Sequence, residues 1–314
     1  MTNLSVDHAL LRAKLHIKKN EITEAKKLYQ AVLLAFPKNL RAQKELATLN
    51  NYKRDDPLRT TFKETLKQLI NLYNQGQLDA VIEKAQSLTK QYPQAYIIWN
   101  ILGAASKGLG RIKEASEAFK KVTELNPNYA DGFNNLGIIL KDQDKLDEAL
   151  EAYKKALYIK PDYAEVYNNM GNAFKYQSKL EKAIEAYNRA ISLKPDYAEA
   201  YYNMGTTFKN QEKLDKAIEA YKRALSIKPD YVEAYNNMGV AFDKQNRFDE
   251  AILAYNKAIS INSDYAEVYN NMGVIFHKQI KLDEAIDAYQ NAILLEPTNT
   301  VYWHNLAYSM LLIK

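Results

Sequence analysis

The sequence contains no cysteine, and it has only four histidines, two tryptophans and ten glycines among its 314 residues. Without cysteine the chain has no disulfide framework, no thiol nucleophile and no thiolate metal ligand. It also lacks a glycine-rich phosphate loop, a nucleophile motif and histidines or carboxylates at metal-binding spacing. We therefore predict a protein that is not an enzyme and that needs no metal or cofactor.

Long apolar runs are missing as well. The N-terminal sequence has no apolar core of the kind found in signal peptides. No apolar run approaches the roughly 20 residues that a membrane-spanning helix needs. We expect a cytoplasmic protein without a membrane partner.

The net charge of +5 is confined to the front of the chain. Residues 1–56 carry 11 Lys and Arg against 6 Asp and Glu, whereas the remaining residues carry 32 of each sign. The excess is spread over short predicted helices, so it indicates a solvated face rather than a nucleic-acid footprint. We predict no nucleic-acid partner.

A period of 34 residues organises most of the chain. The stretch Ala164–Tyr197 returns with few changes as Ala198–Tyr231, Val232–Tyr265 and Ala266–Asn299. Counting Ala164 as repeat position 1, a proline recurs at position 32, with Ser263 in place of one of them. The prolines are Pro93, Pro127, Pro161, Pro195, Pro229 and Pro297. A fixed period of this length is typical of stacked supersecondary units.

Each unit contains two amphipathic patterns separated by a short polar segment. Small or apolar residues fall at repeat positions 4, 7, 8 and 11, and again at 17, 20, 21, 24, 27 and 28. This three-and-four spacing predicts two helices, A and B, in an all-α fold. Asp162 and Glu165 are spaced as a capping box before helix A, and the pairs Asp196/Glu199, Asp230/Glu233 and Asp264/Glu267 repeat it.

The repeated residues resemble the tetratricopeptide (TPR) repeat. The pattern is carried by Trp99, Leu102, Gly103, Ala115, Phe119 and Pro127, and later units substitute mildly at the same positions. The resemblance implies a right-handed α-solenoid of antiparallel helix pairs, a TPR superhelix whose A helices line a concave groove. It also implies that the groove binds a protein or peptide.

The register divides the chain into three parts. Residues 1–56 are predicted to hold one degenerate unit and a lone helix A, ending in a hinge at Lys53–Pro57 with Asp56 as N-cap. Residues 57–299 contain seven units, and 300–314 form a final lone helix A. The units are 62–95, 96–129, 130–163, 164–197, 198–231, 232–265 and 266–299.

Asparagine recurs on helix A away from its apolar face. Position 6 holds Asn135, Asn169, Asn203, Asn237, Asn271 and Asn305, and position 5 holds Asn100, Asn134, Asn168, Asn236 and Asn270. Asparagine is roughly 0.6 kcal/mol worse than alanine inside a helix, so helix propensity does not explain these rows. Lys141, Lys175 and Lys209 at position 12 are the regular cations beside them.

Three interpretations of these asparagines stay open. Recent duplication copied them with the rest of the unit, or they form a structural ladder between repeats. Alternatively, their amides clasp the backbone of an extended peptide, since each amide is both donor and acceptor. This last arrangement resembles the TPR region of O-linked N-acetylglucosamine transferase. The two-carboxylate clamp of other TPR proteins needs Lys or Arg at positions 2, 5 and 6, where this chain has Glu, Asn and Asn.

We therefore expect a non-catalytic scaffold that binds a protein or extended peptide through these asparagines and lysines. Two alternatives remain. The array resembles those that precede sulfotransferase or glycosyltransferase domains in bacterial proteins, so it is alternatively the substrate-recruiting arm of a larger enzyme. The apolar end Met310–Lys314 alternatively joins copies of the chain in an assembly protein.

Overall fold

A computed structural model describes residues 6–19, 21–51 and 57–312, and the described part contains eighteen α-helices and no strand. The chain forms two compact units, residues 1–71 and 72–314. The boundary between the two units lies inside helix α4 (Pro57–Asn74). The predicted division after residue 56 stays a prediction. The predicted hinge segment, apart from Pro57 at the start of α4, lies outside the described residues.

The first unit contains three short helices, α1 (Val6–Lys18), α2 (Ile22–Ala35) and α3 (Leu40–Asn51), followed by most of α4. The short helices share a small core in which Ala25 and Tyr29 of α2 are fully buried. The sequence of α2 keeps the alanine and tyrosine of repeat positions 20 and 24. This core therefore follows the repeat pattern although the rest of the unit is degenerate.

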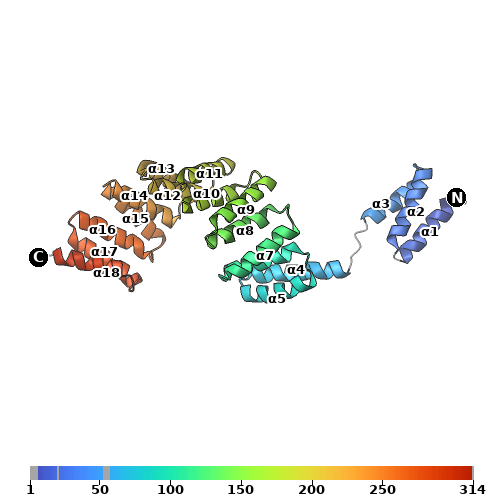
Figure 1. The fold of residues 1–314 in the computed structure, drawn as a ribbon, viewed down its shortest axis with the longest axis horizontal. Helices are drawn as coiled ribbons and strands as arrows, with labels where there is room; N and C mark the ends of the chain where they lie inside the picture. The colour runs from blue at the N-terminus through green and yellow to red at the C-terminus, as the bar shows by residue number, and fades with distance from the viewer. Residues whose placement is uncertain (1–5, 20, 52–56, 313–314) are drawn as a thin grey trace. The chain divides into compact units, whose positions relative to one another are not determined.

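The second unit is a succession of helix pairs, with helix A and helix B of each repeat packed side by side (Figure 1). The A helices are α6 (Tyr96–Gly108), α8 (Ala130–Asp142), α10 (Ala164–Tyr176), α12 (Ala198–Asn210), α14 (Val232–Lys244), α16 (Ala266–Lys278) and the unpaired α18 (Thr300–Leu312). The B helices are α5 (Leu78–Gln91), α7 (Ile112–Leu125), α9 (Leu146–Ile159), α11 (Leu180–Leu193), α13 (Leu214–Ile227), α15 (Phe248–Ile261) and α17 (Leu282–Leu295). The all-α repeat solenoid predicted from the period is confirmed.

The two helices of a repeat meet where a glycine lies under an aromatic ring. The tyrosine at position 24 is fully buried in α9, α11 and α13, and its ring covers the glycine at position 8 of the paired helix A. A Cβ atom placed on Gly205 would lie 2.8 Å from Cδ1 of Tyr221. Carbon atoms pack at roughly 3.5–4.0 Å, so only glycine allows this approach.

The turn from helix A to helix B depends on a left-handed residue at position 15. Gly76 and Gly110 occupy it in the first repeats, with φ of 72° and 70°. Later repeats place other residues there at φ between 58° and 61°, namely Asp144, Ser178, Glu212, Asn246 and Ile280. Two backbone bonds close the turn, as in α10, where Ser178 N donates to Lys175 O and Lys179 N donates to Phe174 O, both at 2.9 Å.

The predicted capping boxes are wrong. At α10 the N-cap residue is Tyr163, and no side-chain hydrogen bond caps the helix. The same holds at Tyr197, Tyr231 and Tyr265 before the next three A helices. Helix A begins one residue later than the Asp–Glu spacing assumed, so Asp162 lies in the turn. The glutamates at position 2 are thereby available for contacts between repeats.

Candidate functional site: a ladder of amides along the A helices

The asparagines of successive A helices are hydrogen-bonded to one another. In each case Nδ2 of the position-6 asparagine donates to Oδ1 of the position-5 asparagine in the preceding repeat. The bonds are Asn135 to Asn100 (3.1 Å), Asn169 to Asn134 (3.0 Å), Asn203 to Asn168 (3.0 Å), Asn271 to Asn236 (3.1 Å) and Asn305 to Asn270 (2.9 Å). We call these contacts the asparagine ladder.

One rung of the ladder is made differently. Repeat 198–231 has Tyr202 at position 5, and Asn237 Nδ2 donates to its hydroxyl at 2.8 Å. Burial raises the pKa of Tyr202, so its hydroxyl stays protonated and neutral at physiological pH. Asn237 Oδ1 also accepts a short hydrogen bond from Lys209 Nζ. The rung therefore survives the substitution because a phenol oxygen replaces an amide oxygen.

The two rows differ in exposure. Four position-5 asparagines are buried, from 1% exposed for Asn168 to 9% for Asn270, whereas Asn100 and Tyr202 are half-buried. The position-6 residues are half-buried, except that Asn203 is 7% exposed. An amide has two donor hydrogens and an oxygen with two lone pairs, and each position-6 amide uses one donor in the ladder. The position-6 row is therefore the part of the ladder that retains free hydrogen-bonding capacity at the surface.

Glutamates at position 2 complete the buried row. Asn168 Nδ2 donates to Glu199 Oε1 at 3.3 Å, and Asn236 Nδ2 donates to Glu267 Oε1 at 3.2 Å. In Asn168 and Asn236 the amide nitrogen and the amide oxygen are thus both bonded to the next A helix. With donor and acceptor both engaged, the position-5 amide cannot flip, and it fixes the orientation of its position-6 partner.

The three predicted lysines lie in consecutive A helices and are half-buried. We call Lys141, Lys175 and Lys209 the lysine column. Lys141 pairs with its neighbour Asp142 at 3.0 Å, and Lys209 donates to Asn237 of the ladder. Burial, and then the charges of Lys141 and Lys209, lower the pKa of Lys175. Burial also lowers the pKa of Lys209.

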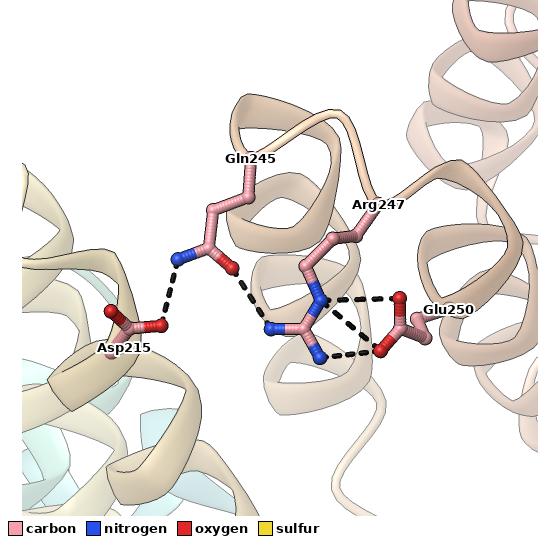
Figure 2. A network of polar contacts seen from close by, with 4 residues as sticks. All are labelled: Asp215, Gln245, Arg247 and Glu250. Atoms are coloured by element: carbon pink, nitrogen blue, oxygen red, sulfur yellow. Dashed lines mark hydrogen bonds and ion pairs between the residues drawn. The ribbon is translucent and has the colours of Figure 1, made fainter.

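A second set of contacts between repeats was missed from the sequence. At the A–B turn, glutamine at position 14 donates to a carboxylate at position 18 of the preceding repeat. The bonds are Gln177 to Asp147 (2.9 Å), Gln211 to Glu181 (3.0 Å) and Gln245 to Asp215 (2.9 Å). Figure 2 shows the third, extended by Arg247, whose Nη1 donates to Gln245 Oε1 at 3.0 Å and which is held by Glu250. The signal was present, because glutamine recurs at position 14 in five successive repeats.

The last helix leaves apolar side chains in contact with solvent. Trp303, Tyr308, Met310, Leu311 and Leu312 of α18 are all at least 51% exposed. In earlier repeats helix B covers several of these positions, and α18 is the last helix that the structure describes. Ile313, which belongs to the predicted self-association end Met310–Lys314, lies outside the described residues. Self-association through this end stays a prediction.

Within the described part of the chain, no helix is both long and apolar enough to cross a membrane. Those residues also contain no group of three or more His, Asp or Glu side chains arranged to hold a metal ion. His16 Nδ1 lies 2.6 Å from Glu21 Oε2, and His277 Nδ1 lies 2.8 Å from the buried Ser309 hydroxyl.

Comparison with known families settles the class of the repeat. Models described as TPR repeat match residues 108–144, 139–178, 171–212, 207–246 and 242–279, and a model described as tetratricopeptide repeat matches 266–299. The chain belongs to the tetratricopeptide repeat family. TPR arrays are protein-interaction scaffolds, and the matched repeats make this chain such a scaffold.

Several solved structures share the TPR fold. A tetratricopeptide repeat protein from Parabacteroides merdae aligns with a TM-score of 0.63 at 15% identity, over 80% of this chain and 99% of that one. The APC/C hetero-tetramer Cut9–Hcn1 aligns with a TM-score of 0.61 at 15% identity, over 97% and 76%. MamA is 33% identical over 53% of this chain and 97% of that one, with a TM-score of 0.47. A comparison with curated protein sequences finds no match.

Proposed function

We propose that this TPR array binds an extended protein segment along its A helices, through the free donors and acceptors of the position-6 asparagines. The observation that supports this is the asparagine ladder, which orients a row of half-exposed amides while leaving each of them able to bond further. Because the amides are held before a ligand arrives, binding loses little side-chain entropy.

The curvature of the array favours the same face. Each A helix from α8 to α16 contacts the A helix of the next repeat, whereas successive B helices contact one another less. Elements that approach more closely lie on the inner side of a curved stack. The position-6 row therefore belongs to the inner, concave face, where an extended segment touches many repeats at once.

The spacing matches a peptide backbone. Helices pack roughly 8–10 Å apart, and an extended strand advances about 3.3 Å per residue. One asparagine then meets about every third residue, so the six position-6 asparagines span a segment of roughly 15 residues. Amides that bond main-chain groups favour accessible, extended segments and place loose demands on side chains.

The two asparagine rows have different roles in this proposal. The buried position-5 asparagines orient the row and do not touch the ligand, whereas the position-6 asparagines do. The buried Asn203 contributes less than Asn169 or Asn271. A purely structural ladder predicts instead that nothing binds along the row.

The test uses a phage library of random 15-residue peptides selected on the full chain, with enriched peptides synthesised for affinity measurements. The variant Asn169→Ala with Asn271→Ala should weaken binding about tenfold, because each lost hydrogen bond is worth about 0.5–1.5 kcal/mol. The matched control is Asn188→Ala with Asn256→Ala, which removes two exposed asparagines from the B helices α11 and α15.

Main-chain recognition has its own signature on the peptide side. N-methylation at every third residue should reduce affinity in one of the three registers, while permuting the side chains should matter less. Circular dichroism and thermal melts establish that the variants stay folded. The proposal fails if no peptide is enriched over background, or if the A-helix and B-helix variants bind equally well.

A further inference from the structure

The lysine column lies beside the asparagine ladder and is joined to it. Lys141, Lys175 and Lys209 occupy repeat position 12 in α8, α10 and α12, one helical turn or more beyond the asparagines. Lys209 Nζ donates to the oxygen of Asn237, which is the ligand-facing group of that rung. Lys141 Nζ lies 5.8 Å from the ring centroid of the exposed Tyr176, which belongs to the next repeat.

Lys175 differs from its two neighbours because its charge has no partner. In the described residues Lys141 has Asp142 and Lys209 has Asn237, but Lys175 makes no ion pair or hydrogen bond. Burial, and then the charges of its neighbours Lys141 and Lys209, disfavour its charged form and lower the pKa of Lys175. An unpaired, partly buried ammonium between two others is unfavourable unless an anion approaches.

Other lysines of the array show the contrast. Lys154 pairs with Glu151 at 2.7 Å, and Lys121 pairs with Glu124 at 2.9 Å on the outer B helices. At position 12 of α14 the lysine is replaced by Asp243, which accepts from Lys278 Nζ at 2.7 and 2.8 Å. Among the half-buried position-12 lysines, Lys175 is therefore the one that makes no ion pair or hydrogen bond in the described residues.

We propose that Lys175, flanked by Lys141 and Lys209, binds a carboxylate of the extended segment that lies on the asparagine ladder. The inference rests on the proposed function and adds a charge preference to it: the ladder holds the main chain, and the column selects an acidic group in one part of the groove. The neighbouring Tyr176 offers its exposed ring to the aliphatic part of an acidic side chain. This site differs from a two-carboxylate clamp, because positions 2, 5 and 6 of α8, α10 and α12 carry no cation.

The test compares three synthetic 15-residue peptides of alternating serine and threonine. The first has a central Glu and an amidated C-terminus, and the second has Gln in its place. The third has the central Gln and a free C-terminal carboxylate, so that it separates a chain end from an acidic side chain. Binding of each is measured to the wild type, to Lys175→Gln and to the control Lys182→Gln, which removes an exposed lysine from the B helix α11.

The wild type should bind a carboxylate-bearing peptide about tenfold more tightly than the neutral one, since hydrogen bonds to charged groups are stronger than neutral ones. The preference should disappear in Lys175→Gln, persist in Lys182→Gln and shrink as salt is raised. As a second readout, the peptide should protect Lys175 from an amine-acylating reagent and leave Lys182 reactive.

The outcomes separate the two proposals. If all three peptides bind equally to the wild type and Lys175 is not protected, the carboxylate site is overturned while binding along the ladder stands. A carboxylate preference that Lys175→Gln leaves intact also overturns it. If none of the peptides binds and the library selection also fails, the proposed function and the carboxylate site are both overturned.

Discussion

Within a repeat, helix A and helix B meet through apolar contact, whereas successive A helices meet through paired amides. At the first interface a buried tyrosine ring lies on a glycine, and the Tyr187 hydroxyl also donates to Asn172 Oδ1 at 2.8 Å. At the second interface, amides and carboxylates bond across the repeats, and the position-6 amides other than Asn203 stay partly exposed to solvent. The fold thus depends mainly on the first interface, and the second can carry a binding surface without endangering it.

The largest expected effect breaks the apolar interface. Gly205→Val places a side chain where Tyr221 now lies, and overpacking of this kind costs about 3 kcal/mol. Repeat position 8 offers a matched control in α18, where Ala307 is exposed and no described helix covers it. Ala307→Val should cost about 0.5 kcal/mol, the difference in helix propensity. Urea unfolding followed by circular dichroism measures both, and equal losses would contradict the assigned role of helix B.

The contrast between interfaces also explains what the sequence could predict. Apolar spacing within one helix reports which face is buried, so the helix pairs and their order follow from the period. The partner of an asparagine depends on the distance between two helices, which the pattern of one helix does not contain. Only the structure therefore reveals the contacts between repeats: donation from position 6 to position 5, the bonds to Glu199 and Glu267, and the glutamine contacts.

The capping prediction shows the same limit at the level of one residue. The Asp–Glu spacing fits a capping box at Asp162, yet the helix begins after Tyr163. The glutamate at position 2 instead contributes to the surface between repeats, as Glu199 does by accepting from Asn168. The spacing picked out polar residues that do take part in contacts, but it assigned them to the helix N-terminus instead of to the neighbouring repeat.

The next effect separates the two asparagine rows. Asn168→Ala should cost about 2 kcal/mol, because it leaves the buried Asn203 amide without its acceptor and the exposed Glu199 without its donor. Asn169→Ala should cost about 1 kcal/mol or less, since the better helix propensity of alanine offsets part of the lost bond. Hydrogen exchange at the α10 amides would resolve the two even if the array does not unfold in a single step. A larger loss for Asn169 would reverse the assignment of roles.

A smaller effect should strengthen the turns. Ile280 holds a left-handed conformation at φ 61° and is 81% exposed, so its side chain gives little packing in return for the strain. Ile280→Gly should raise stability by about 1 kcal/mol, because a left-handed backbone costs an L-residue about 1–2 kcal/mol. The reverse change, Gly110→Ile at the equivalent position, should lower stability by a similar amount. Thermal melts of the pair check both directions, and an unchanged melting temperature in each would contradict a strained turn.

The smallest effect tests whether the exposed glutamine contacts matter as much as the ladder. Gln245 donates to Asp215 at 2.9 Å near the surface, so water replaces either partner at little cost (Figure 2). Gln245→Ala should therefore change the free energy of unfolding by about 0.5 kcal/mol or less, below the effect of Asn168→Ala. A double-mutant cycle with Asp215→Ala isolates the pair, and we expect a coupling energy of no more than about 0.5 kcal/mol. A coupling as large as that between Asn168 and Asn203 would show that both polar surfaces hold the repeats together, and that the amides along the A helices are not the distinctive polar contact between them.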